Sequence, residues 1–258
     1  MSSAQVTNID VAYPEAADLH LRLSVGACRL RITPGEGGSW VTGSYRDPSG
    51  ALPPRVHLEG GTVRITQEYN VAEVFGLFSG APSFDLALGK ARPYSLAVES
   101  GASDNALDLG GLPLDRLTVR QGAGRMEIDF SAPNPRPMSQ LDVGAGAGEM
   151  RVRNLANANC ADVNIEGGAA LYKLDFGGML QRDARARVST GMSSVEILVP
   201  ATTAARIGSE SLLGGLDVGD GFMKREGAFW TEAALAGRTP VLTIRVNVAL
   251  GALSIRTG

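Results

Sequence analysis

The 258-residue chain has few cysteines, few aromatic side chains and no long apolar run. Its two cysteines, Cys28 and Cys160, form no Cys-x-x-Cys pair, so we expect small apolar side chains there and not a disulfide or a zinc site. With aromatics at 5%, the core must consist mainly of Val, Leu and Ile. The sequence contains no stretch of about 18 apolar residues, so it predicts no transmembrane helix. The net charge of −3, with both signs interspersed, leaves no basic stretch for nucleic acid.

Signatures of catalysis are also missing. No Gly-x-Ser-x-Gly elbow and no Gly-Lys-Ser/Thr loop occurs. The glycine-rich residues 144–148 resemble a phosphate loop, but such a loop needs a following helix, and residues 149–153 have the pattern of a strand. Asp217, Asp220 and Glu226 surround a glycine turn and could hold calcium, although their spacing matches no defined calcium loop. The sequence predicts no enzyme and no catalytic, cofactor-binding or metal-binding residue.

The feature that is present is a repeat. Pairs of apolar residues one apart are followed by a Gly/Ala-rich turn and then by further alternating apolar residues. Successive repeats are offset by 21, 24, 22 and 23 residues, measured at Val98, Val119, Val143, Ile165 and Val188. The residue nine positions later is apolar in every repeat: Leu107, Ile128, Val152, Leu174 and Ile197. A short fixed period of this kind is typical of a solenoid.

Alternation over four to six residues is the period of a half-buried strand. Each repeat therefore predicts a strand, a glycine turn and a second strand, stacked as one coil of an all-β, solenoid-like array. The valine-rich positions should form one buried column and the positions nine later a second. Outward positions should place opposite charges on neighbouring coils. A meander of antiparallel hairpins is the alternative, because the glycine turns would also suit hairpins.

The ends of the chain are less regular than the middle. We expect residues 1–83 to form a β-rich cap with a connecting segment, and residues 84–258 to form the repeat domain, beginning with a strand at 84–88. Alternating residues at 241–248 and 253–255 predict a closing C-terminal hairpin. A solenoid needs such ends because an open coil exposes core and unpaired strand edge.

One apolar segment, residues 71–78, interrupts the β pattern. Val74, Phe75, Leu77 and Phe78 would either fold over the end of the solenoid, which we expect, or present an interaction surface for a partner. The substitution Phe75→Ala separates the two hypotheses. It should cost about 3–5 kcal/mol of stability if Phe75 covers the core. It should weaken association alone if Phe75 contacts a partner.

Two phrases, residues 141–148 and 246–255, resemble the bacterial toast-rack family of adhesin-like β-solenoid domains, which has kin in the C-terminal domains of cell-wall-stress response accessory proteins. The likeness covers about residues 84–258. It implies a rack-like sheet and a bacterial source. The family has no established catalytic residues, so the resemblance transfers none. Many relatives carry membrane segments or lipid anchors beside this domain.

These observations favour a non-enzymatic bacterial scaffold or protein-interaction domain, with a protein partner or with a homo-oligomer formed through coil ends or an edge. We predict neither nucleic-acid binding nor membrane insertion. The alternative is a carbohydrate-binding or carbohydrate-active solenoid, which would need two carboxylates about 5–9.5 Å apart beside aromatic side chains. The first five residues resemble no signal peptide, which predicts a cytoplasmic protein as written, or an extracytoplasmic one if a signal or anchor has been removed.

Overall fold

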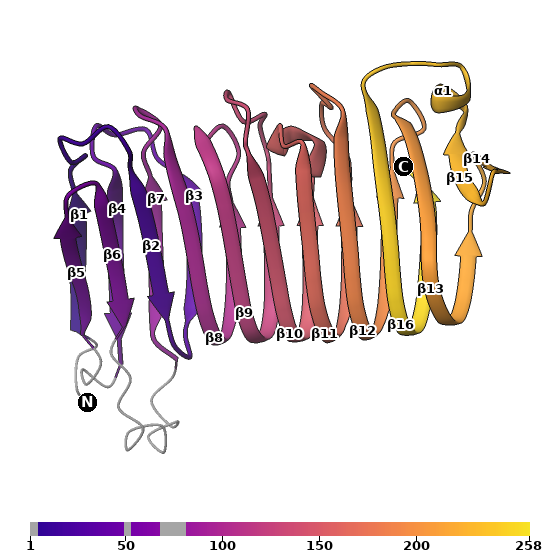
Figure 1. Ribbon diagram of the computed structural model, residues 1–258. Helices are drawn as coiled ribbons and strands as arrows, with labels where there is room; N and C mark the ends of the chain where they lie inside the picture. Colours follow the sequence, from indigo (N-terminus) through magenta and orange to yellow (C-terminus); the bar gives the residue numbers. More distant parts are fainter. Residues whose placement is uncertain (1–4, 49–52, 68–80) are drawn as a thin grey trace.

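The computed structural model describes residues 5–48, 53–67 and 81–258, which are mostly β-strand (Figure 1). The described strands form one 16-stranded sheet. In chain order these strands are β1 (Gln5–Val11), β2 (His20–Val25), β3 (Arg29–Pro34), β4 (Val41–Asp47), β5 (Pro54–Glu59), β6 (Thr62–Gln67), β7 (Ser83–Leu88), β8 (Tyr94–Asp108), β9 (Leu114–Asp129), β10 (Gln140–Arg153), β11 (Asp162–Asp175), β12 (Ala184–Val199), β13 (Ala204–Val218), β14 (Phe222–Arg225), β15 (Ala228–Thr231) and β16 (Val241–Thr257). The helical elements of the described residues are a 3-10 helix, η2 (Leu155–Ala158), and α1 (Glu232–Leu235).

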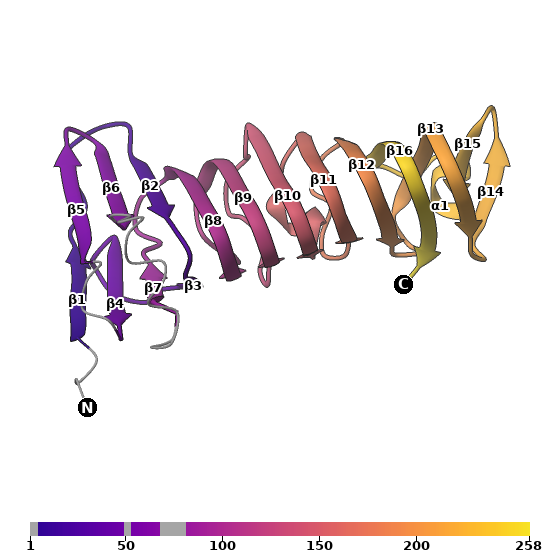
Figure 2. The same ribbon diagram turned by 90° about the horizontal axis from the view of Figure 1, so that it is seen from below.

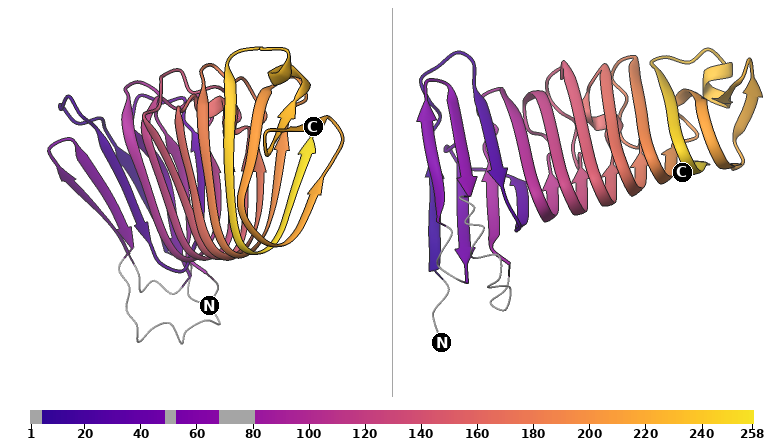
Figure 3. Two further views of the ribbon diagram at one scale, coloured as in Figure 1. Left: turned by 45° about the vertical axis from the view of Figure 1, so that its right-hand side comes forward. Right: turned by 60° about the horizontal axis from the view of Figure 1, so that its bottom comes forward.

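The middle of the molecule is a rack of long strands, β8 to β12, each bent once near its centre (Figure 3). Neighbouring strands run parallel, and the two arms of each strand face one another across the core. The predicted strand, glycine turn and second strand are thus one continuous bent strand, and a loop at the open side leads to the next. This arrangement confirms the all-β, solenoid-like fold and excludes the meander of antiparallel hairpins.

Both predicted columns are confirmed. Val143 pairs in register with Val119 on one side and with Ile165 on the other, and Ile165 pairs with Val188. The second column is equally regular, and its members are almost completely buried: Ile128, Val152, Leu174 and Ile197. Because the register is kept through each bend, a single period in the sequence places residues of both arms in the core.

Opposite charges also meet on the outer face, as expected. Arg153 lies 3.5 Å from Asp129, and Lys173 lies 3.6 Å from Glu196. These side chains are partly exposed to solvent, so each pair contributes little to stability.

Glycine is needed where the strands bend. Gly148 has a φ of +120°, and a Cβ at this position would lie 2.0 Å from the carbonyl oxygen of Gly124 on the neighbouring strand. At Gly146 a Cβ would lie 2.4 Å from the carbonyl oxygen of Gly122. No side chain fits at either distance. The Gly/Ala-rich segments therefore allow the backbones of neighbouring strands to stay in close contact where the strands bend.

The N-terminal strands continue the rack instead of standing apart from it. Leu23 of β2 pairs with Val98, and Ile32 of β3 pairs with Leu107, so β2 and β3 together match the two arms of β8. Beyond this point the sheet splits into two layers, β2–β6–β5 and β3–β7–β4–β1 (Figure 2). Strand β7 pairs with β3 and β4, so it is not the first strand of the regular part. The division into residues 1–83 and 84–258 stays a prediction.

The C-terminal end differs from expectation in one respect. Strand β16 forms no hairpin, because it follows β12 in register through the bend, with Leu250 beside Met192 and Leu253 beside Val195. It lies between β12 and β13, although β13 precedes it in sequence. A hairpin does close this end, but it consists of β14 and β15, which pair antiparallel and join the sheet at β13.

Candidate functional site

The interaction surface predicted from the sequence, Val74, Phe75, Leu77 and Phe78, lies outside the described residues. Whether these side chains cover the core or meet a partner stays a prediction. The described part of the chain offers two other surfaces, at the N-terminal end of the rack and on the outer face of β3 and β7.

The first surface is the core face of β5, the edge strand of its layer. Val56 lies opposite Ile65, and Leu58 lies opposite Val63, and both partners on β6 are completely buried. Opposed residues of a strand pair share a face, so Val56 and Leu58 also point to the core side. Nevertheless they are 45% and 61% exposed. We call Val56 and Leu58 the open end. No described strand other than β6 pairs with β5, so β5 is an edge strand of the described sheet.

Sequence reasoning placed the residues of β5 within a β-rich cap but missed the exposure of Val56 and Leu58. The alternation of Val56 and Leu58 marks a core face, and such residues are normally buried. Exposure arises because no further described strand lies beyond β5, which is a property of the assembled sheet. A hint lay in the neighbouring sequence, where the loop before β5 and the segment after β6 lack the repeat.

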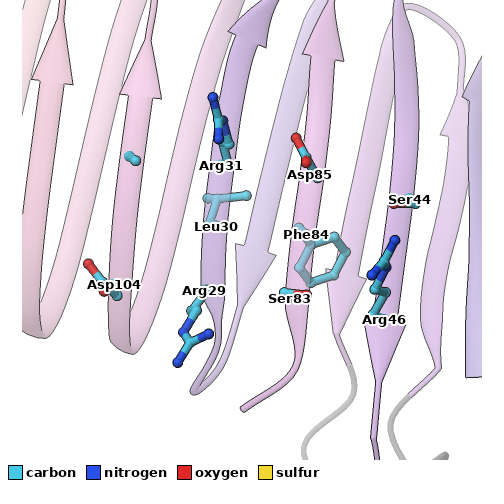
Figure 4. Close-up of a pocket in the computed structure, with 10 residues that line it drawn as sticks. Arg29, Leu30, Arg31, Ser44, Arg46, Ser83, Phe84, Asp85 and Asp104 are labelled. Atoms are coloured by element: carbon cyan, nitrogen blue, oxygen red, sulfur yellow. The ribbon is translucent and has the colours of Figure 1, made fainter. Parts of the chain in front are cut away.

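The second surface is a depression of about 400 Å³ on the outer face of β4, β7, β3 and β8 (Figure 4). Alternation in β3 buries Leu30 and turns Arg29 and Arg31 outward. Asp85 is in register with Arg31, and Asp104 is in register with Arg29. The remaining lining residues are Ser44, Arg46, Ser83, Phe84 and Ala106.

The chemistry of this depression is that of binding. Its guanidinium groups can hold carboxylate or phosphate oxygens. The Cα atoms of Asp85 and Asp104 lie roughly 11–12 Å apart by strand geometry, since one strand and two residues along the strands separate them. The aromatic lining residue, Phe84, is buried and offers no face for a sugar. The depression thus lacks the exposed aromatic side chains that the carbohydrate-active alternative calls for.

The cysteines behave as the sequence predicts. Cys28 and Cys160 are both buried and unbridged. Burial raises the pKa of Cys28 to about 12 and that of Cys160 to about 11. Because the thiolate is the nucleophilic form, neither group is poised to attack a substrate near neutral pH.

Two of the three acidic residues that could have held calcium, Asp217 and Glu226, contact arginines instead. The Asp217 carboxylate pairs with Arg256, and this contact lowers the pKa of Asp217 below its usual value. Glu226 lies 3.6 Å from Arg225. Within residues 5–48, 53–67 and 81–258, no three His, Cys, Asp or Glu side chains gather as metal ligands would. In the same ranges no helix has the length and apolar character needed to cross a membrane.

Comparison with known proteins identifies the family. The profile described as the N-terminal domain of toast_rack, DUF2154, matches residues 1–139, which is more than half of the chain. The chain therefore belongs to the toast-rack family, and the resemblance found in the sequence is confirmed. The matched residues include the strands that split into two layers, whereas the sequence phrases pointed to residues 84–258. No curated protein sequence matches the chain.

Three solved structures resemble this chain to different degrees. A candidate cell adhesion protein from Clostridium sporogenes aligns with a TM-score of 0.51 and 14% identity, over 99% of this chain and 100% of its own. A candidate adhesin from Bacteroides fragilis has a TM-score of 0.35 and 10% identity, over 100% of this chain and 98% of its own. A candidate lipid binding protein from Parabacteroides distasonis has a TM-score of 0.36 and 10% identity, over 99% and 96%. At this identity the first likeness shows the fold alone.

Proposed function

We propose that this chain is a non-enzymatic interaction module of a bacterial surface protein, which associates with a second copy of itself through the open end. The observation that carries the proposal is the exposure of Val56 and Leu58 on the core face of an edge strand. A strand edge beside exposed apolar side chains is a template for pairing with another chain.

A second copy suits this end geometrically. Two β5 strands that pair antiparallel about a two-fold axis would extend both sheets into one. Val56 and Leu58 of each copy would then be covered by those of the other. The main-chain hydrogen bonds would supply affinity, and the apolar pairs would fix the register. Such an interface closes on itself, so the expected assembly is a dimer.

An extracytoplasmic location belongs to the same proposal. It is supported by the candidate adhesion role of the Clostridium sporogenes neighbour, which shares this fold over its full length. The cytoplasmic prediction, which depended on the first residues of the sequence, finds no support. The non-enzymatic part of the proposal is supported by the burial of both thiols, which keeps them in the unreactive protonated form near neutral pH.

The test is sedimentation velocity over a wide range of protein concentration. Wild-type protein should dimerise, and Val56→Lys/Leu58→Lys should stay monomeric because two buried charges would face two more across the interface. The milder variant Val56→Thr/Leu58→Thr keeps the strand propensity of β5, so it tests the interface even if the lysine variant misfolds. Met179→Lys/Met223→Lys changes two equally exposed apolar residues elsewhere and should dimerise normally.

The outcomes separate the hypotheses. A wild-type chain that is monomeric at every concentration refutes self-association through β5. A dimer that survives in both β5 variants places the interface elsewhere. A monomer that releases sugars from a bacterial glycan would reverse the non-enzymatic assignment.

A further inference from the structure

Within the depression on the outer face of β4, β7, β3 and β8, a serine lies between two arginines. Ser83 of β7 pairs in register with Arg29 of β3 on one side and with Arg46 of β4 on the other. Both arginines are exposed, and Figure 4 shows them on opposite sides of Ser83. Residues in register on neighbouring strands lie about 4.8 Å apart. Because serine is short and arginine is long, both guanidinium groups can turn toward a group seated over Ser83.

A third arginine and a second hydroxyl lie on the same face. Arg31 follows Arg29 by two residues on β3, so both side chains project from one side of the strand. By strand geometry the Cα of Arg31 lies roughly 8 Å from that of Ser83. Ser44 precedes Arg46 by two residues on β4 and also lines the depression. Three cationic side chains and two hydroxyl groups therefore surround one hollow.

Two carboxylates share the depression, and they leave it with a net charge of +1, from three arginines and two aspartates. Asp85 is in register with Arg31. Asp104 lies between Arg29 and Arg125 of β9, so one carboxylate serves two cations. Among the described residues, neither aspartate forms an ion pair with an arginine of the depression. An incoming anion would therefore not have to break a contact that is already made.

Arg46 is the arginine with the least compensation. Its in-register neighbours are Val6 and Ser83, and neither is acidic. Asp85, the carboxylate of the neighbouring strand, lies two residues along β7 from Ser83. An anion over Ser83 would thus have an arginine directly on each side and the carboxylate only at a distance.

We propose that this depression binds a phosphate group, held over Ser83 by Arg29, Arg46 and Arg31. A phosphate ester carries a charge of about −1.5 to −2 at pH 7 and three strong acceptor oxygens, which suits three guanidinium donors. The planar fork of arginine matches the geometry of phosphate oxygens. A carboxylate has a single charge and two oxygens, so it would leave one of the three arginines without a partner.

The depression is larger than a phosphate group. Its volume is about 400 Å³, whereas the five heavy atoms of phosphate fill at most roughly 150 Å³ if each takes the share of a liquid water molecule, about 30 Å³. Room therefore remains for the alcohol part of a phosphate ester. Asp85 and Asp104 can accept hydrogen bonds from hydroxyl groups in that space. The class of ligand that fits best is a phosphate ester of a hydroxylated compound.

This site is independent of the self-association proposed above. The depression lies on the layer β3–β7–β4–β1 and on β8, whereas the open end belongs to the layer β2–β6–β5. Val56→Lys/Leu58→Lys should therefore bind phosphate as wild type does. Either proposal can fail while the other holds.

The test is isothermal titration calorimetry of the whole chain with inorganic phosphate and with glycerol 3-phosphate at low ionic strength. Wild-type protein should bind both, the ester at least as tightly, and added salt should weaken the binding. Arg29→Gln/Arg46→Gln should weaken it at least about tenfold. Asp85→Asn should tighten it about two- to fivefold, because a nearby negative charge is removed. A damaged fold would not produce that gain.

A second pair of arginines provides the matched control. Arg22 and Arg64 are in register on β2 and β6 and are both exposed, but they do not line this depression. Arg22→Gln/Arg64→Gln makes the same change of charge and should bind phosphate as wild type does. Circular dichroism checks that each variant is folded.

Four results would overturn the proposal: no binding of either phosphate compound, unchanged affinity in Arg29→Gln/Arg46→Gln, an equal loss in the control pair, or acetate bound as tightly as phosphate. An equal loss in the control would mean that the charge of the whole molecule attracts the anion, with no site at Ser83. If the ester binds more weakly than inorganic phosphate, the ester assignment is wrong and free phosphate is the ligand.

Discussion

Replacing one bend glycine by alanine should destabilise the rack severely. In Gly148→Ala the new methyl group would lie 2.0 Å from the carbonyl oxygen of Gly124, and the backbone would have to keep a φ of +120°. The strained φ costs about 1–3 kcal/mol. The steric overlap costs about 1–3 kcal/mol more, because the obstacle is backbone held in a parallel ladder. We expect a total of about 2–6 kcal/mol.

Thermal unfolding followed by circular dichroism measures this loss. For a domain of this size about 2–6 kcal/mol corresponds to a fall in Tm of roughly 4–24 °C. Gly208→Ala is the matched control, since nothing lies within 4 Å of its Cβ position and its φ is not left-handed. It should be neutral or stabilise by about 0.4–1 kcal/mol. If Gly148→Ala melts within about 2 °C of wild type, the strands can separate at the bend, and the close-contact argument is wrong.

Three further predictions concern the stability of the core, at Asn105, Ile165 and Cys28. Asn105 is completely buried at a position where the repeat carries Met126, and its Oδ1 has no partner. Asn105→Met should therefore raise the free energy of unfolding, measured in urea, by about 1–3 kcal/mol. A decrease would show that the 2.8 Å hydrogen bond from Asn105 Nδ2 to Ser100 Oγ outweighs the cost of the unpaired Oδ1. Ile165→Ala should lower the same quantity by about 2–5 kcal/mol, and a much smaller loss would contradict close packing of the column. Stability should fall as pH rises above about 9, because the unfolded Cys28 thiol ionises there while the folded one, with a pKa of about 12, keeps its proton. Unfolding at several pH values checks this, and Cys28→Ala should make the decline less steep.

The sequence by itself determined the coil and its core. Alternation is a local property, and a fixed offset between Val143 and Ile165 is enough to put them side by side once strands stack in parallel. One bend glycine was recognisable for the same reason, since it stands three residues after the buried Val or Ile of every repeat: Gly101, Gly122, Gly146, Gly168 and Gly191. The sequence also predicted that Cys28 and Cys160 would be buried as apolar residues.

The tertiary structure decided the order of the strands and what their assembly leaves exposed. Strand β16 pairs with β12 in register through the bend. No local sequence pattern predicts that β16, and not β13, is the neighbour of β12. Val56 and Leu58 have a core pattern, and they are exposed because their layer of the described sheet, β2–β6–β5, ends at β5. Local periodicity sets which face a side chain takes, whereas long-range pairing sets which side chains become neighbours and which of them meet solvent.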